Sequence, residues 1–462
     1  MLQLKRIDSS EAPQEHQHSG DQVTKPPEPA QPQHMFLYYQ GPYSWSCLSA
    51  SPWKDEIFLS YLVADLGPMG TLYRKIAMSS DQPDSSQRAA TKQCFLALAT
   101  TFYGVGHAEE SIVDGGRRIY SRALTMLNAT ISDSSRHGMT ETLSSVVALS
   151  LHEAIAPTLT NSHTWLCHIN GLEQLFAAHG PITDASDPLV KVLVEATRLI
   201  MITVTLYTRR PSLMSRPEWK AANTNQSVYD SALPYILDAL AQLPTLYSER
   251  DALVSDSQTQ APGDTDGTSS PYPILGVQSL LGSSLGLLND IRAQRTQWMD
   301  SHPNSEFPSL PSTRIYSIQP YPCRIITHFS SLHVANAFTL YNCLLILINQ
   351  FIISVCRLIP TKHRDILAEE LASEQVSVAA VEILKSIDYH LPFTLPASES
   401  ILHGSGPRNF YLLFPMRVAF QVLSQSESLN ALSQKLWLKD IFDVIKGRAG
   451  PWASNEQIFR LG

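Results

Sequence analysis

Apolar positions recur at helical spacing along most of this chain. In the segment 143–155, Leu143 begins a series of apolar side chains at positions i, i+3, i+4, i+8, i+11 and i+12, which places them on one face of a helix. The segment 165–176 repeats this pattern. Gly180-Pro181 predicts the end of that helix, because a flexible residue followed by a helix breaker stops helical growth.

The same pattern predicts helices along the rest of the chain. They are expected near 88–104, 111–129, 187–209, 229–243, 274–299, 325–359, 364–389, 410–425 and 430–447. No alternation of apolar and polar residues is long enough to predict a sheet. We therefore predict an all-α protein.

Three segments interrupt the helical pattern. Residues 1–34 hold five prolines and no Phe, Tyr or Trp, so we expect a disordered tail. Residues 251–273 are rich in Ser, Thr, Asp, Gly and Pro and predict a mobile loop, and residues 301–322 contain five prolines and predict another. Because the helical pattern resumes unchanged after each loop, we favour one large irregular helical domain over a two-lobed arrangement.

Composition narrows the class of protein. The chain has 462 residues, 44% of them hydrophobic, which is enough for a large core and excludes wholesale disorder. Its 34 Lys and Arg against 42 Asp and Glu give a net charge of −8. An acidic chain without a block of basic residues lacks the electrostatic footprint of direct nucleic-acid binding.

The cysteines predict buried, reduced thiols. The closest two of the six, Cys343 and Cys356, are 13 residues apart, whereas structural zinc sites use pairs separated by two to four residues. Their apolar neighbours and this spacing are typical of an intracellular protein. No apolar run follows the charges near Met1, so we expect no signal peptide.

One string matches a hydrolase motif. Gly282-Ser283-Ser284-Leu285-Gly286 fits G-x-S-x-G, in which the central serine is a nucleophile on a sharp strand-to-helix turn. Here leucines at helical spacing run through the string and no strand precedes it. We therefore interpret it as a helix with small residues at a packing face, and we keep a hydrolase with nucleophilic Ser284 as the alternative.

Other catalytic or metal-binding patterns are incomplete, so we predict no catalytic residues, no metal site and no cofactor. His152-Glu153 begins like the zincin motif H-E-x-x-H, but Ala156 stands in place of the second histidine. Two histidine pairs are five residues apart, which turns them about 140° away from each other on a helix; they are His163 with His168 and His328 with His333. No phosphate-binding loop occurs.

The segment Ala337–Ile359 is apolar enough to be compared with a membrane span. Its one charged residue is Arg357, but Asn342, Asn349 and Gln350 interrupt the apolar run. Polar amides are costly inside a bilayer, whereas a helix that is apolar on all sides suits the centre of a large α-domain. We predict a core helix and no membrane association.

Several strings together resemble one family. Trp165-Leu166-Cys167-His168, followed by Gly171 and then Gly180-Pro181, resembles the W-x-x-H-x-x-G…G-P segment of the fungal-specific transcription factor domain. Further strings occur in the order of that family; they are Gly115–Leu124 with Tyr120, Ser150-Leu151-His152-Glu153, Ala337–Asn342, Phe414–Ala419 and Trp437-Leu438. The resemblance spans about residues 50–455 and implies a helical regulatory domain.

The chain departs from that family at its beginning. Family members carry six cysteines near the N-terminus, which bind two zinc ions and present a helix to the DNA major groove. The first 46 residues here contain no cysteine. Because metal binding supplies the folding free energy of such a module, we expect this chain not to read DNA by that route. Either the start of the gene is misassigned, or the protein is a regulator without the DNA-binding module.

The resemblance implies a transcription regulator, not an enzyme, that acts in the nucleus through its helical domain on a metabolic or secondary-metabolite gene set. It implies protein partners, either DNA-bound regulators or a second copy of the chain, and leaves room for a small-molecule effector between helices. Two alternatives stay open, the hydrolase with Ser284 and a non-catalytic helical scaffold.

Overall fold

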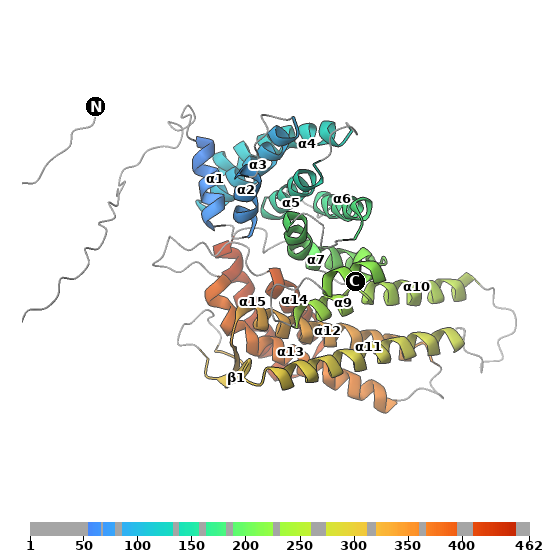
Figure 1. The fold of residues 1–462 in the computed structure, drawn as a ribbon. Coiled ribbons are helices and arrows are strands. Elements are labelled where there is room, and N and C mark those ends of the chain that lie inside the picture. Colours follow the sequence, from blue (N-terminus) through green and yellow to red (C-terminus); the bar gives the residue numbers. More distant parts are fainter. Residues whose placement is uncertain are drawn as a thin grey trace, which may run out of the picture. The chain divides into compact units, whose positions relative to one another are not determined.

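Helices form most of the described structure, which confirms the all-α class (Figure 1). The computed structural model describes residues 54–65, 68–78, 86–132, 138–156, 163–181, 188–224, 232–259, 274–311, 320–359, 366–394 and 410–449. The elements are α1 (Lys54–Asp65), α2 (Pro68–Met78), α3 (Ser86–Gly106), α4 (Glu110–Ser132), α5 (Met139–Ile155), α6 (His163–His179), α7 (Pro188–Thr208), the 3-10 turn η2 (Leu213–Ser215), α8 (Pro217–Thr224), α9 (Leu233–Leu240), α10 (Leu243–Thr259), α11 (Ile274–Ser301), β1 (Glu306–Ser309), β2 (Ile326–Phe329), α12 (Leu332–Cys356), α13 (Ile366–Thr394), α14 (Phe410–Gln425) and α15 (Leu429–Ala449).

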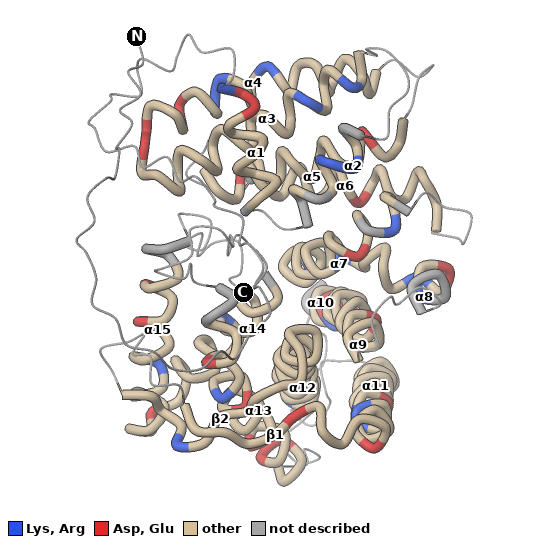
Figure 2. The backbone as a smooth tube through the Cα atoms, turned by 60° about the vertical axis from the view of Figure 1, so that its left-hand side comes forward, with Lys and Arg blue, Asp and Glu red and all other residues tan. Residues whose placement is uncertain are grey.

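Two central helices organise the packing. Helix α3 contacts α1, α4 and α5, and α5 also contacts α6 and α7. Helix α12 contacts α9, α11, α13 and α14, and one continuous apolar core runs through both groups. Figure 2 shows α12 without a charged residue along its length, whereas charged residues are visible on α4, α11 and α15. The core therefore lies around a helix that has no Asp, Glu, Lys or Arg.

Most of the apolar segment Ala337–Ile359 lies in α12. Helices α11 and α12 are both long and apolar enough to cross a bilayer by length and composition alone. In α12, however, 78% of the most apolar window is buried by protein, compared with 33% in α11. Burial of that extent matches the predicted core helix.

Helix α6 ends as the sequence predicts. Its last residue is His179, and Gly180 follows with φ of 87°, a left-handed conformation that favours glycine. The Gly180 amide donates to the Phe176 carbonyl at 3.0 Å, so the cap satisfies one of the last carbonyls of the helix. The G-P string is therefore a helix stop.

A small sheet corrects two predictions. Strands β1 and β2 pair antiparallel, with Glu306 opposite Phe329, inside segments that we expected to be a loop (301–322) and a helix (325–359). Each strand has four residues, which is too short for a clear alternation of apolar and polar positions. Helix α12 begins only after Ser331, whose hydroxyl accepts from the Val334 amide at 3.3 Å as an N-cap.

The prediction of one helix over residues 229–243 is also corrected. The structure has two helices here, α9 and α10, and the second extends beyond residue 243. Helix α9 ends at Leu240 and α10 begins at Leu243, since Pro244 lacks the amide proton that a continuous helix needs and its ring would collide with the Leu240 carbonyl. Helix α10 extends to Thr259, into the segment 251–273 that we expected to be a loop. Helices α1, α2 and α8 were absent from the predicted set.

Two predictions fall wholly or partly outside the described residues. The tail 1–34 lies outside them, as do both proposed limits of the domain, residues 50 and 455. The described residues from Lys54 onward belong to one unit by their contacts. The single domain of residues 50–455 stays a prediction.

Two glycines bring α3 and α4 close together. A Cβ at Gly116 would overlap the Thr101 hydroxyl and would lie 3.0 Å from its amide nitrogen, and a Cβ at Gly104 would lie 2.8 Å from the Val113 nitrogen. Such distances are shorter than normal van der Waals contact. Gly116 is therefore a packing residue, because only glycine permits this approach of the two backbones.

The described cysteines include buried thiols, as predicted. Cys94, Cys323, Cys343 and Cys356 are buried, Cys167 is exposed, and none of these five forms a disulfide. Burial raises the pKa of the Cys94 thiol to about 12, which keeps that thiol protonated and unreactive near neutral pH. Cys47 lies outside the described residues.

Candidate functional site

The serine of the hydrolase-like string is buried inside a helix. Ser284 is 0% exposed on α11, and its hydroxyl donates to the Leu281 carbonyl of the same helix at 2.9 Å. A nucleophile elbow instead exposes the serine on a strand-to-helix turn, where a histidine reaches it. At Ser284 the described structure has neither that turn nor that exposure, so the geometry disfavours the hydrolase alternative.

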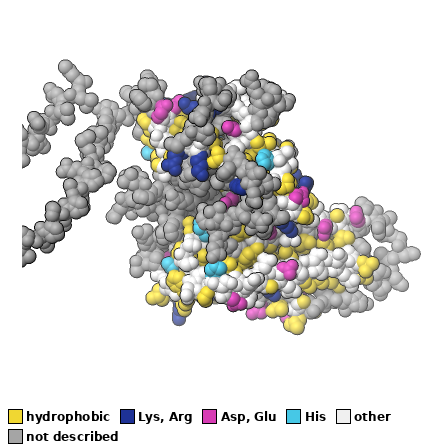
Figure 3. Space-filling model, in the orientation of Figure 1, with side chains coloured by type: hydrophobic (Ala, Val, Ile, Leu, Met, Phe, Trp, Pro, Cys, Tyr) yellow, Lys and Arg dark blue, Asp and Glu magenta, His cyan; other side chains and the backbone are white. Residues whose placement is uncertain are grey.

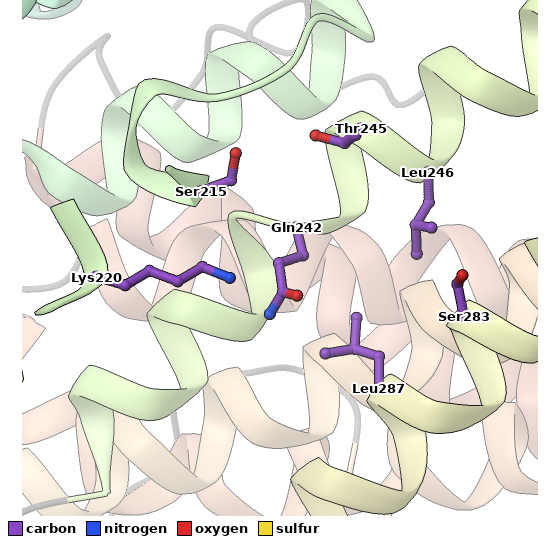
Figure 4. A pocket seen from close by; sticks show the side chains of 7 residues that line it. All are labelled: Ser215, Lys220, Gln242, Thr245, Leu246, Ser283 and Leu287. Atoms are coloured by element: carbon purple, nitrogen blue, oxygen red, sulfur yellow. The ribbon is translucent and has the colours of Figure 1, made fainter. Parts of the chain in front are cut away.

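Ser283, the preceding residue, faces a small pocket (Figure 4). Its volume is about 250 Å³, and its lining comes from η2, α8, α10, α11 and the turn between α9 and α10. Figure 4 shows the Lys220 side chain extending toward Gln242, with Leu287 between Gln242 and Ser283 in this view. Among the described residues that line the pocket there is no histidine or carboxylate to activate Ser283.

Three strings of the family resemblance meet in one buried cluster. Tyr120 of α4 stacks on the His152 ring of α5 with centroids 4.3 Å apart and planes 11° from parallel. The Tyr120 hydroxyl lies 2.7 Å from Nε2 of His168 on α6. Glu153, next to His152, is also buried. We call these four residues the Tyr-His cluster; it joins α4, α5 and α6.

Burial sets the protonation of the Tyr-His cluster. It lowers the pKa of His152 to about 3, and electrostatic repulsion between the protonated forms of His152 and His168, together with the charge of Arg117, acts in the same direction. The pKa of His168 is also lowered by burial, against the opposing attraction of Glu153. Burial and the Glu153 carboxylate raise the pKa of Tyr120. Near neutral pH the cluster therefore contains neutral imidazoles and a protonated phenol.

The Tyr-His cluster packs α4, α5 and α6 together. Both ring nitrogens of His152 are buried without a hydrogen-bond partner among the described residues. Its imidazole is fully buried and stacks on the Tyr120 ring. We conclude that these residues fix the relative positions of three helices.

The predicted absence of a metal site remains a prediction. Within the described ranges, no group of three or more His, Cys, Asp or Glu side chains is placed to hold a metal ion. His328 lies on β2 and His333 on α12, so these two do not share one helix. The His163 side chain is outside the described residues, which leaves its pairing with His168 untested.

A second cavity was not predicted from the sequence. It has a volume of about 480 Å³ and is lined by residues of α7, α10, α12, α13 and α14, together with Arg209 and Arg357 at helix ends. Arg209, Arg250 and Arg357 are far apart in the chain and form no basic block. A sequence pattern could identify them only after the helix packing was known.

Comparison with protein families places these strings in a known context. The model described as the fungal specific transcription factor domain matches residues 57–401, which is well over half of the 462 residues. No curated protein and no solved structure matches the chain. The matched range includes the Tyr-His cluster and most of the lining of the larger cavity.

Proposed function

The chain belongs to the family of fungal-specific transcription factor domains, and from this premise we propose that it controls a metabolic or secondary-metabolite gene set from the nucleus. A transcription-regulator-like role is what the family supports, and the family is generally non-enzymatic. The specific gene set and the nuclear location are our proposal.

The match over residues 57–401 carries this proposal. The Tyr-His cluster supports it, because strings that resemble the family at Tyr120, His152 and His168 meet in space. These residues resemble the family in sequence, and in this structure they also hold three helices together. We therefore expect the chain to share the fold of that family. The buried hydroxyl of Ser284 supports the same choice against a hydrolase.

We propose that protein partners connect this domain to DNA. On the face drawn in Figure 3, the described Lys and Arg side chains are interspersed with acidic, apolar and neutral ones. A surface of this kind suits contacts with proteins better than a run of phosphate contacts. The partner would be a DNA-bound regulator or a second copy of this chain.

A deletion strain tests the proposal. We expect deletion to change the expression of a defined gene set under conditions in which the protein is made, and a fluorescent fusion of the full chain to be nuclear. Wild-type and Ser284→Ala chains should both restore expression. An unchanged transcriptome would contradict the proposal, and failure of a folded Ser284→Ala chain alone would favour the hydrolase.

A further inference from the structure

Three arginines line the cavity of about 480 Å³. Its described lining contains Arg209, Arg250 and Arg357 but no Asp or Glu. Two carboxylates contact these arginines: Asp251 pairs with Arg209 and Arg250, and Glu369 lies 3.9 Å from Arg357. Three guanidinium groups thus line the cavity, and its described lining adds no carboxylate of its own.

The inner arginine is held in place before any ligand arrives. Arg250 is 15% exposed, and it donates to Asp251 from Nε at 3.1 Å and Nη2 at 2.6 Å and to the Ser354 hydroxyl from Nη1 at 3.0 Å. Three of its five N–H groups are therefore engaged by described residues. Burial would raise the pKa of Asp251, but hydrogen bonds from Arg250 and Arg209 outweigh it and keep that pKa below its ordinary value.

An aromatic ring aligns two of the guanidinium groups. The Arg209 and Arg250 groups lie over the Tyr247 ring at 5.7 and 5.5 Å from its centroid. Arg209 also has φ of 51°, in the left-handed region that residues with a side chain rarely adopt. This conformation is a helix C-cap, in which the Arg210 amide donates to the Thr205 carbonyl at 3.1 Å, and it places Arg209 at the end of α7 beside the cavity.

The remaining lining suits an organic body attached to an anionic group. Aliphatic side chains such as Leu206, Leu347 and Val376 offer apolar contacts, while Gln350, Gln421 and Ser373 offer neutral hydrogen bonds. A cavity of about 480 Å³ falls within the range of small-molecule sites. Planar guanidinium groups favour carboxylate and phosphate oxygens over neutral groups.

We propose that this cavity binds a small organic anion, a carboxylate or a phosphate ester, as the effector of the regulatory domain. The ligand would contact α7 and α10 on one side and α12, α13 and α14 on the other, and so would stabilise one arrangement of these helices. The regulatory meaning of the site rests on the proposed function, whereas anion binding does not.

Binding is tested on the purified full chain with four probes: citrate, inorganic pyrophosphate, 2-naphthyl phosphate and, as the neutral counterpart of the last, 2-naphthol. Thermal unfolding is followed at constant ionic strength set with NaCl, and dissociation constants are measured by calorimetry. We expect at least one anion to raise the melting temperature above the NaCl control, and 2-naphthol to have no comparable effect. Citrate and pyrophosphate distinguish carboxylate from phosphate preference.

Three variants assign the binding to the cavity. Arg250→Gln should weaken binding by about tenfold or more, because it removes charge-assisted hydrogen bonds. Arg357→Gln, at a side chain 68% exposed and therefore tolerant of change, should weaken it by several fold. Arg122→Gln, at an exposed position on α4, is the matched control and should leave affinity unchanged.

Two results would overturn the inference. One is the absence of any anion-specific stabilisation at millimolar concentration, and the other is affinity that is unchanged in both Arg250→Gln and Arg357→Gln. The outcome is separable from the proposed function. A deletion strain with altered expression but no anion binding would remove only this inference, and anion binding without altered expression would remove only the proposed function.

Discussion

The phenol oxygen of Tyr120 lies 2.7 Å from Nε2 of His168, although 48 residues separate them in the chain. This hydrogen bond joins α4 to α6, two helices that both pack beside α5. The same phenol ring stacks on His152, so one side chain contacts both of the other helices. The stability of the N-terminal helices is therefore expected to depend strongly on Tyr120.

Replacing Tyr120 with Phe should keep the ring stacking and remove the hydrogen bond to His168. We expect the free energy of unfolding to fall by about 1–2 kcal/mol, because a partly buried imidazole nitrogen loses its partner. Urea unfolding followed by circular dichroism measures the change. Tyr207→Phe, at an exposed tyrosine, is the matched control and should change stability by less than about 0.5 kcal/mol.

Acidification should destabilise the fold through His152. Its pKa is about 3 in the folded chain and 6.5 as the ordinary value, so the unfolded chain binds the proton more readily. The stability contributed by neutral His152 is full above pH 6.5 and is lost as the pH falls toward 3. Between pH 7 and pH 5 this loss is about 2 kcal/mol.

The variant His152→Phe tests this dependence, since phenylalanine can stack on Tyr120 but does not titrate. Unfolding free energies at pH 7 and pH 5 should differ less in the variant than in the wild type, by about 2 kcal/mol. His390 is also buried with its pKa lowered to about 3, so part of the dependence should persist in the variant. Equal pH dependence in both chains would show that His152 does not titrate as described.

Gly116→Ala should separate α3 from α4. The added methyl group would overlap the Thr101 side chain and press on its backbone, so we expect a loss of about 1–3 kcal/mol in unfolding free energy. Gly171→Ala on α6 is the control, because its new Cβ would meet nothing within 4 Å. Alanine is the better helix former, and that variant should be more stable by about 0.5–1 kcal/mol. Thermal unfolding of both variants gives the comparison, and equal effects would contradict the close helix approach.

Ser284 should not react with a fluorophosphonate probe that labels nucleophilic serines. Its hydroxyl is buried and donates to Leu281, so neither access nor activation is provided. The native chain should show no labelling above that of Ser284→Ala, measured by mass spectrometry of the labelled peptides. Stoichiometric labelling at Ser284 would revive the hydrolase alternative.

Sequence reasoning was most successful where a local rule decides the structure. Periodicity identified most helices, and Gly180 marked the end of α6 because its left-handed backbone is a local requirement. Sequence periodicity failed where the pairing of strands or the packing of helices determines the structure. The strand Glu306–Ser309 is too short to show a period and forms only against Ile326–Phe329, more than a dozen residues further along the chain.

The residues of the candidate sites could be predicted only in part, for the same reason. His152 and His168 could be singled out as part of recognisable strings, but their meeting at Tyr120 depends on how three helices pack. The arginine-lined cavity had no signal in the sequence. Arg209, Arg250 and Arg357 converge only because the ends of α7 and α12 lie beside α10.

The burial of α12 has a consequence for the synthesis of the protein. Two of its packing partners, α13 and α14, follow it in the chain, so they leave the ribosome later. Until they arrive, the nascent chain displays a long uncharged helix whose apolar faces are incompletely covered. Such a surface invites chaperone binding and aggregation. Translation that stops between Cys356 and Phe410 should therefore give an aggregation-prone fragment, so efficient production of this domain depends on completing its last helices.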